Sequence, residues 1–103
     1  ATGIINPDLI PQQTRLGSNY PNPFTESTNL RYDLSRDGDV FIEIFKVSGE
    51  KVRLLLHENA MAGHYELVWD GKDDFGRPVP SGLYVFQLKS GSYIHSRKMI
   101  LMR

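Results

Sequence analysis

Residues 69–84 read WDGKDDFGRPVPSGLY and join two alternating apolar segments through a turn rich in aspartate, glycine and proline. Glycine reaches positive φ without a Cβ penalty, and proline fixes its own φ while holding the preceding residue extended. Aspartate side chains accept hydrogen bonds from N–H groups of their own turn. The segment therefore predicts a rigid, self-capped connector between two strands, with the structural turn residues Asp70, Gly71, Asp73, Asp74 and Gly76.

Apolar and polar residues alternate with a period of two on both sides of this connector, the pattern of half-buried strands. Turn residues such as Asp37-Gly38 and Ser90-Gly91-Ser92 separate neighbouring segments. No stretch has helical periodicity. We therefore predict an all-β fold, an immunoglobulin-like antiparallel β-sandwich of about seven strands. The expected inward rows are Leu30/Tyr32/Leu34, Val40/Ile42/Ile44, Val52/Leu54/Leu56, Tyr65/Leu67/Trp69 and Tyr84/Phe86/Leu88.

Three segments carry more specific expectations. Residues 20–24 read YPNPF, where two prolines prevent ladder pairing, and we expect Tyr20 and Phe24 to pack against the core. Residues 57–62 are expected to connect one sheet to the other. Residues 93–102 are expected to form the final strand.

Length and composition describe a single soluble-type domain. The chain has 103 residues, 40% of them hydrophobic, and no cysteine that could form a disulfide or a thiolate metal site. We interpret residues 1–15 as a linker or the end of a preceding domain and residues 16–103 as the domain, with a first edge strand over 16–19. Twelve acidic and twelve basic side chains cancel, so no nucleic-acid partner is expected. No apolar run approaches the ~20 residues of a membrane span.

The connector is also the place where a metal site could be suspected. Calcium binds several carboxylate and carbonyl oxygens, and three aspartates lie close together here. The spacing is not that of an EF-hand loop, and Lys72 places a positive charge inside the cluster, so turn capping is the favoured interpretation. His57, His64 and His95 lie on different segments without ligand spacing, and we expect them to be exposed. No metal and no cofactor are predicted.

Catalytic signatures are missing as well. Serine, histidine and acidic residues occur, but there is no Gly-x-Ser-x-Gly elbow, and no carboxylate pair stands out as general acid and base. The sequence therefore predicts a domain that is not an enzyme. The many aromatic residues could include a platform for stacking sugars, although most aromatics of a small sandwich fill its core. Trp69 falls in an inward row and is expected in that core.

The last strand admits two interpretations. Arg97 and Lys98 lie within it, and basic residues on an edge strand discourage edge-to-edge pairing. Alternatively, a receptor reads the exposed strand and its basic pair as an address. The residues alone do not separate these interpretations.

Four motifs in order carry a resemblance to a known family. They are YPNPF at residues 20–24, the glycine of VSGEKV at Gly49, PSGLY at residues 80–84, and the basic-apolar strand at residues 97–101. Over residues 16–103 the chain resembles the C-terminal sorting domains of proteins exported by the bacterial type IX secretion system. These domains are similar to the immunoglobulin-like domain of the flagellar hook-capping protein.

The resemblance implies a non-catalytic export label at the end of a longer protein. Its partners would be an N-terminal passenger domain, the outer-membrane export machinery and a surface sortase-like protease that removes the domain and attaches the passenger to the cell surface. The location would be secreted or cell surface, reached through the periplasm. The N-terminus lacks the charged and apolar regions of a signal peptide, as expected of a C-terminal portion. Recognition is assigned by resemblance to Gly49, Pro80, Ser81, Gly82, Tyr84, Arg97, Lys98 and Leu101.

Two alternatives belong to other functional classes. One is a structural or adhesion module like the hook-capping domain, acting through surface contacts of Phe41 and Phe45. Flagellar gene neighbours, in place of a large upstream hydrolase, would indicate it. The other is a carbohydrate-binding accessory domain of an extracellular hydrolase, which affinity electrophoresis on polysaccharides would detect.

Overall fold

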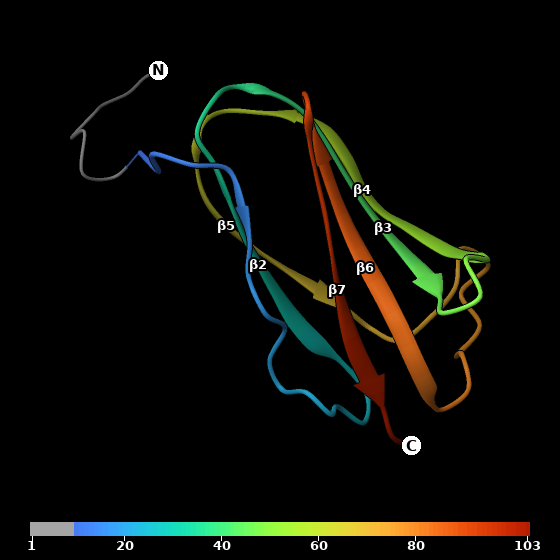
Figure 1. Ribbon diagram of the computed structural model, residues 1–103. Coiled ribbons are helices and arrows are strands. Elements are labelled where there is room, and N and C mark those ends of the chain that lie inside the picture. The colour runs from blue at the N-terminus through green and yellow to red at the C-terminus, as the bar shows by residue number, and fades with distance from the viewer. Residues whose placement is uncertain (1–9) are drawn as a thin grey trace.

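The computed structural model describes residues 10–103, which form a two-layered antiparallel β-sandwich without a helix (Figure 1). No part of these residues offers a helix long and apolar enough to cross a membrane. The prediction of an all-β immunoglobulin-like sandwich is confirmed. The seven strands are β1 (Arg15–Leu16), β2 (Thr28–Leu34), β3 (Gly38–Lys46), β4 (Lys51–Ala60), β5 (Gly63–Trp69), β6 (Gly82–Ser90) and β7 (Tyr93–Leu101).

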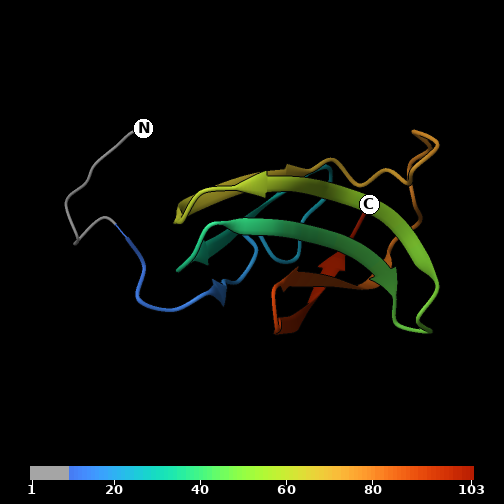
Figure 2. The same cartoon turned by 90° about the horizontal axis from the view of Figure 1, so that it is seen from above.

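The strands divide into a three-stranded sheet with the order β1-β2-β5 and a four-stranded sheet with the order β4-β3-β6-β7. All neighbours pair antiparallel. The chain therefore changes sheet after β2, after β4 and after β5, where the connector of residues 70–81 makes the change. Seen from above, this connector lies at the end of the sandwich opposite the residues that lead into β1 (Figure 2).

The core lies between the two sheets and is built from the inward rows. The alternation places the β2, β3 and β6 rows fully inside, and Trp69 ends the β5 row with no exposed surface. The ring centroid of Trp69 is 5.7 Å from that of Phe24 and 5.6 Å from that of Tyr84, both edge-to-face. Such pairs are favourable beyond the area they bury. Trp69 therefore joins the two sheets and the segment before β2.

Of the two aromatic residues of the YPNPF segment, only one packs against the core as predicted. Phe24 is 1% exposed, but Tyr20 is 77% exposed, so the prediction that Tyr20 packs against the core is wrong. The backbone explains the difference. Tyr20 pairs through its main chain with Asn29 at the margin of β2, whereas Phe24 forms a parallel bridge with Leu101 and points between the sheets. Both X-Pro peptide bonds of the segment are cis.

Strand β4 is longer and less regular than predicted. It continues to Ala60, paired with Gly38, so the sheet-to-sheet connection is Met61-Ala62 and not residues 57–62. The register slips between Ile42 and Glu43, leaving Leu55 as an extra residue. The slip breaks the period of two, and Leu54, expected inside, is 37% exposed.

Within residues 10–103, strand pairing begins at Arg15. Thr14 Oγ1 accepts a hydrogen bond from the Ser35 N–H at 3.1 Å, and Arg15 is the first residue paired with β2. The predicted strand over 16–19 is thus shorter and begins one residue earlier. The predicted linker lies mostly outside the described residues.

The central tryptophan gives a direct test of the core. Trp69→Ala should lower the free energy of unfolding by about 3–5 kcal/mol, because a large buried side chain is replaced by a cavity. Phe75→Ala is the control, since Phe75 is 80% exposed, and it should cost less than about 1 kcal/mol. Urea denaturation followed by circular dichroism measures both. Equal costs for the two variants would contradict the assignment of Trp69 as the centre of the core.

Candidate functional site

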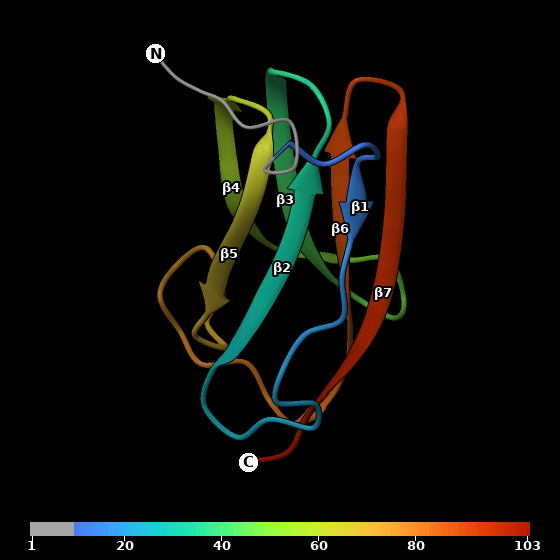
Figure 3. The ribbon, with the colours of Figure 1, turned by 90° about the vertical axis from the view of Figure 1, so that its left-hand side faces the viewer.

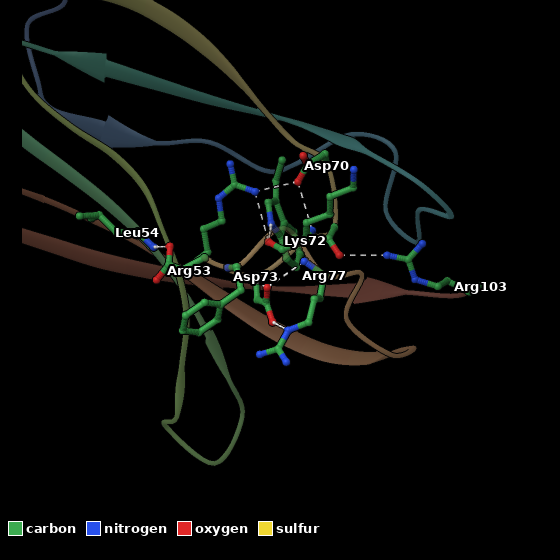
Figure 4. Close-up of polar contacts among 11 residues, drawn as sticks. Arg53, Leu54, Asp70, Lys72, Asp73, Arg77 and Arg103 are labelled. Carbon is green, nitrogen blue, oxygen red and sulfur yellow. Dashed lines mark hydrogen bonds and ion pairs between the residues drawn. The ribbon is translucent and has the colours of Figure 1, made fainter.

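The connector caps itself, as its sequence predicts (Figure 4). Asp73 Oδ1 accepts hydrogen bonds from the Phe75 N–H at 2.9 Å and the Arg77 N–H at 3.0 Å. Asp70 Oδ1 accepts one from the Lys72 N–H at 3.1 Å. Three backbone N–H groups of the turn, those of Lys72, Phe75 and Arg77, are thereby satisfied by aspartate side chains.

The third aspartate binds the connector to the sheet. Asp74 Oδ1 accepts a hydrogen bond from the Leu54 N–H at 3.0 Å, at the irregular part of β4. From the same strand, Arg53 Nη1 donates to Asp70 Oδ1 at 2.9 Å (Figure 4). Trp69 Nε1 donates to the Lys72 carbonyl at 3.0 Å. The connector is therefore held from the β4 side and from the core.

Arg103 holds the connector from the other side, and sequence reasoning missed it. Its Nε donates to the Val79 carbonyl and its Nη2 to the Gly71 carbonyl, each at 2.9 Å. Its backbone N–H donates to Ser81 Oγ at 2.8 Å. The only signal in the sequence is a basic residue directly after the final strand, which does not specify these carbonyls.

The aspartates of the connector are occupied by donors and not arranged as ligands. Their oxygens accept from backbone N–H groups, and Arg53 and Arg77 approach Asp70 and Asp73. Within residues 10–103 no three histidine, aspartate or glutamate side chains gather closely enough for a metal site. These contacts support the capping interpretation over calcium binding.

Hydrogen bonding also shifts the ionisation of Asp73. The Arg77 backbone N–H holds the pKa of the Asp73 carboxyl below its usual value, with further lowering from the Phe75 N–H and the Arg77 charge, against a smaller opposing effect of desolvation. At the other end of the connector, burial raises the pKa of Tyr84 above its usual value. Tyr84 donates its hydroxyl proton to the Pro80 carbonyl at 2.6 Å.

The fold brings most of the motif residues of the resemblance together. Gly82 pairs with Leu101, and Tyr84 pairs with Met99, so the PSGLY motif lies along the end of β7. Ser81 Oγ accepts a hydrogen bond from the backbone N–H of Arg103, two residues after the end of this strand. Gly49 is apart from them. It occupies the β3–β4 turn with φ of 97°, on the side of the sheet opposite β7.

The two basic residues of the last strand have different environments. Arg97 Nε donates to the Leu16 carbonyl at 2.8 Å, and Arg97 Nη1 lies 3.5 Å from Ser18 Oγ. Arg97 thus joins the open margins of the two sheets. Lys98 points to the outer face, is exposed, and makes no ion pair or hydrogen bond through its side chain with any residue of 10–103. Of the pair, Lys98 is the residue available to a partner.

Histidines and aromatics do not form a second site. His57, His64 and His95 are exposed on separate strands, as predicted. Trp69 has no exposed surface with which to stack a sugar. Phe41 and Phe45 lie half-buried on the outer face of β3, where the Phe41 ring stacks on His57 with centroids 4.1 Å apart.

This architecture defines an immunoglobulin-like β-sandwich domain. The chain belongs to the FlgD Ig-like domain family, which matches residues 20–93. No curated protein matches it.

Two solved structures from Porphyromonas gingivalis are similar to the chain. Dimeric latent PorU matches with a TM-score of 0.66 and 23% identity, covering 84% of this chain and 9% of PorU. PorZ, described as an essential surface component of the type IX secretion system, matches with a TM-score of 0.56 and 18% identity, covering 84% of this chain and 11% of PorZ. The chain thus spans about a tenth of each protein, and at these identities the likeness shows the fold alone.

The two connector glycines provide a matched pair of variants. Gly71 and Gly76 have φ of 74° and 78°, but a Cβ on Gly71 would lie 2.7 Å from Arg103 Nη2, and one on Gly76 would meet nothing within 4 Å. Gly76→Ala should therefore cost about 1–2 kcal/mol of stability through backbone strain alone. Gly71→Ala should cost roughly 2–5 kcal/mol, because the added Cβ would also lie 3.1 Å from the Glu26 carbonyl oxygen and would displace Arg103 Nη2 from the Gly71 carbonyl. Equal costs in urea denaturation would show that Glu26 and Arg103 do not fill the space beside Gly71.

The lowered pKa of Asp73 predicts a dependence of stability on pH. In the folded protein the pKa of the Asp73 carboxyl lies below the usual aspartate value of 3.8. The carboxylate therefore stabilises the fold fully above that value, and its contribution is lost as the pH falls through the lowered pKa. Between neutral pH and about pH 3 the wild type should lose more stability than Asp73→Asn. Urea midpoints at both pH values measure this, and parallel losses would contradict it.

Proposed function

We propose that this domain is a non-catalytic C-terminal sorting domain, recognised by the outer-membrane machinery of a type IX secretion system. The observation that carries the proposal is the gathering of the family motifs. PSGLY and the closing basic-apolar strand form one end of β6 and β7, with Lys98 exposed beside them. The likeness in fold to PorZ, a surface component of that system, supports it.

In this proposal a passenger domain precedes the sandwich. The passenger crosses the outer membrane with it, and a sortase-like surface protease removes the domain. The described chain enters its first strand at Arg15, at the end away from the connector (Figure 2). A passenger attached there leaves the connector and the end of β7 accessible to a receptor.

A structural module is the second candidate, and membership of the FlgD Ig-like family favours it. Such a module would act through its outer face, where Phe41 and Phe45 of β3 are half-buried. If the domain is a structural module, Phe45→Ala should weaken assembly and leave export unaffected. If it is a sorting domain, Phe45→Ala should leave export unaffected and a substitution of Lys98 should reduce it.

Export of a fluorescent passenger tests the proposal. A fusion to residues 10–103, which includes the contacts of Thr14 and Arg15, should appear outside a bacterium that carries the type IX machinery. Lys98→Ala should reduce the exported fraction about tenfold, the effect of losing roughly 1.4 kcal/mol of recognition. Lys51→Ala is the control, because Lys51 is an exposed cation on β4, at the opposite edge of the sheet from β7. Retention of the folded wild-type fusion in the periplasm would overturn the proposal.

A further inference from the structure

Strand β7 has an edge that no strand covers within residues 10–103. It is the last strand of its sheet, at the right-hand side of Figure 3, and among the strands of residues 10–103 only β6 pairs with it. The hairpin turn has two residues, Gly91 and Ser92, so the flanking pair Ser90 and Tyr93 is hydrogen-bonded. The bonds then alternate, and the even-numbered residues of β7 direct their N–H and C=O groups away from β6.

The C-terminal part of this edge is already paired. The Ile100 N–H donates to Asn22 Oδ1 at 2.9 Å, and the Ile100 carbonyl accepts from the Phe24 N–H at 3.0 Å. The Met102 N–H donates to the Phe24 carbonyl at 2.8 Å. The domain itself therefore shows that this edge accepts an extended segment, with Phe24 in a parallel bridge to Leu101.

The remainder of the edge is open. Ile94, Ser96 and Lys98 each present one outward N–H and one outward C=O, and no residue of 10–103 hydrogen-bonds to these groups. All three residues are exposed, Ile94 by 62%. A row of unpaired backbone groups is a template for an added strand, in which the main chain gives affinity and alternate side chains give selectivity.

Charge selects the kind of strand that fits. His95, Arg97 and Lys98 lie on this part of β7, and residues 93–101 contain no acidic residue. Pairing of two copies would bring two basic edges together, which disfavours a homodimer here. A strand carrying carboxylates would meet Lys98 on the outer face, whereas Arg97 is already bound to the Leu16 carbonyl.

We propose that the β7 edge over residues 94–98 is a strand-addition site for an extended acidic segment of the export machinery. The identity of the partner rests on the proposed function, but the chemistry of the site does not. The added strand would continue the four-stranded sheet beyond β7, next to the place where residues 22–24 already pair. Lys98 would then form an ion pair that the isolated domain lacks.

A binding experiment tests the site without the secretion system. The probe is a seven-residue peptide alternating glutamate and valine, titrated into the domain and followed by NMR and amide hydrogen exchange. It should shift the signals of residues 93–99 and slow exchange at Ile94, Ser96 and Lys98. The same peptide with lysine in place of glutamate, or with N-methylated amides, should bind at least about tenfold more weakly. Equal binding of the N-methylated peptide would overturn strand addition.

Two variants locate the interaction. Ser96→Pro removes an outward N–H that the fold does not use, and proline is tolerated on an edge strand where its N–H would face solvent. Lys98→Glu reverses the free charge without touching the backbone. Each should weaken glutamate-peptide binding about tenfold with an unchanged urea midpoint. Lys51→Ala, on the opposite edge of the sheet, should leave the binding unchanged. If Ser96→Pro fails to fold, Lys98→Glu decides, and unchanged binding would overturn the proposal.

Export of the same variants separates this inference from the proposed function. Strand addition predicts that folded Ser96→Pro and Lys98→Glu fusions are retained while the wild type is exported. Normal export of both variants beside an exported wild type would overturn strand addition and the role of Lys98 in recognition, whereas export of the wild type would still support a sorting function. If the wild type is not exported, the sorting proposal fails, and the peptide titration alone decides whether the edge accepts a strand.

Discussion

The burial of Trp69 between Phe24 and Tyr84 is the interaction on which the rest of the structure depends. These three rings come from β5, from the segment before β2 and from β6, so one cluster closes the end of the sandwich across both sheets. The indole N–H is not left unpaired, because it donates to the Lys72 carbonyl at 3.0 Å. The connector thus starts from a fixed point in the core, which allows its many polar groups to be positioned.

Polar contacts then extend this closure to the surface. The aspartates of the connector satisfy its backbone donors, and Arg103 satisfies carbonyls of Gly71 and Val79. A buried backbone group without a hydrogen-bond partner raises the free energy of the folded state. Each of these contacts therefore stabilises the connector in its observed conformation. The motif residues of β6 and β7 consequently lie at the end of the molecule where these contacts hold the connector.

The edge of β7 is covered by contacts along part of its length and open along the rest. Arg97 joins β7 to the carbonyl of Leu16 in β1 across the gap between the sheets, and Asn22 and Phe24 cover the C-terminal part of the β7 edge. Between these contacts the outward backbone groups of residues 94–98 remain open. The two basic residues of the motif therefore differ in role, because Arg97 makes structural contacts within the domain and Lys98 is exposed.

The sequence by itself determined the fold class, the inward rows of β2, β3 and β6, the buried place of Trp69 and the capping of the connector. All of these follow from local rules, since a period of two fixes which side chains share a face, and aspartate beside glycine fixes a capped turn. Tertiary structure alone decided that Tyr20 is exposed while Phe24 is buried, that Leu55 is an extra residue in β4, and that Arg103 reaches the connector. Each of these features depends on residues distant in the sequence. Tyr20 and Phe24 are placed by backbone bridges, Leu55 by the slipped register with β3, and Arg103 by carbonyls 24 and 32 residues away. No local pattern encodes such pairings.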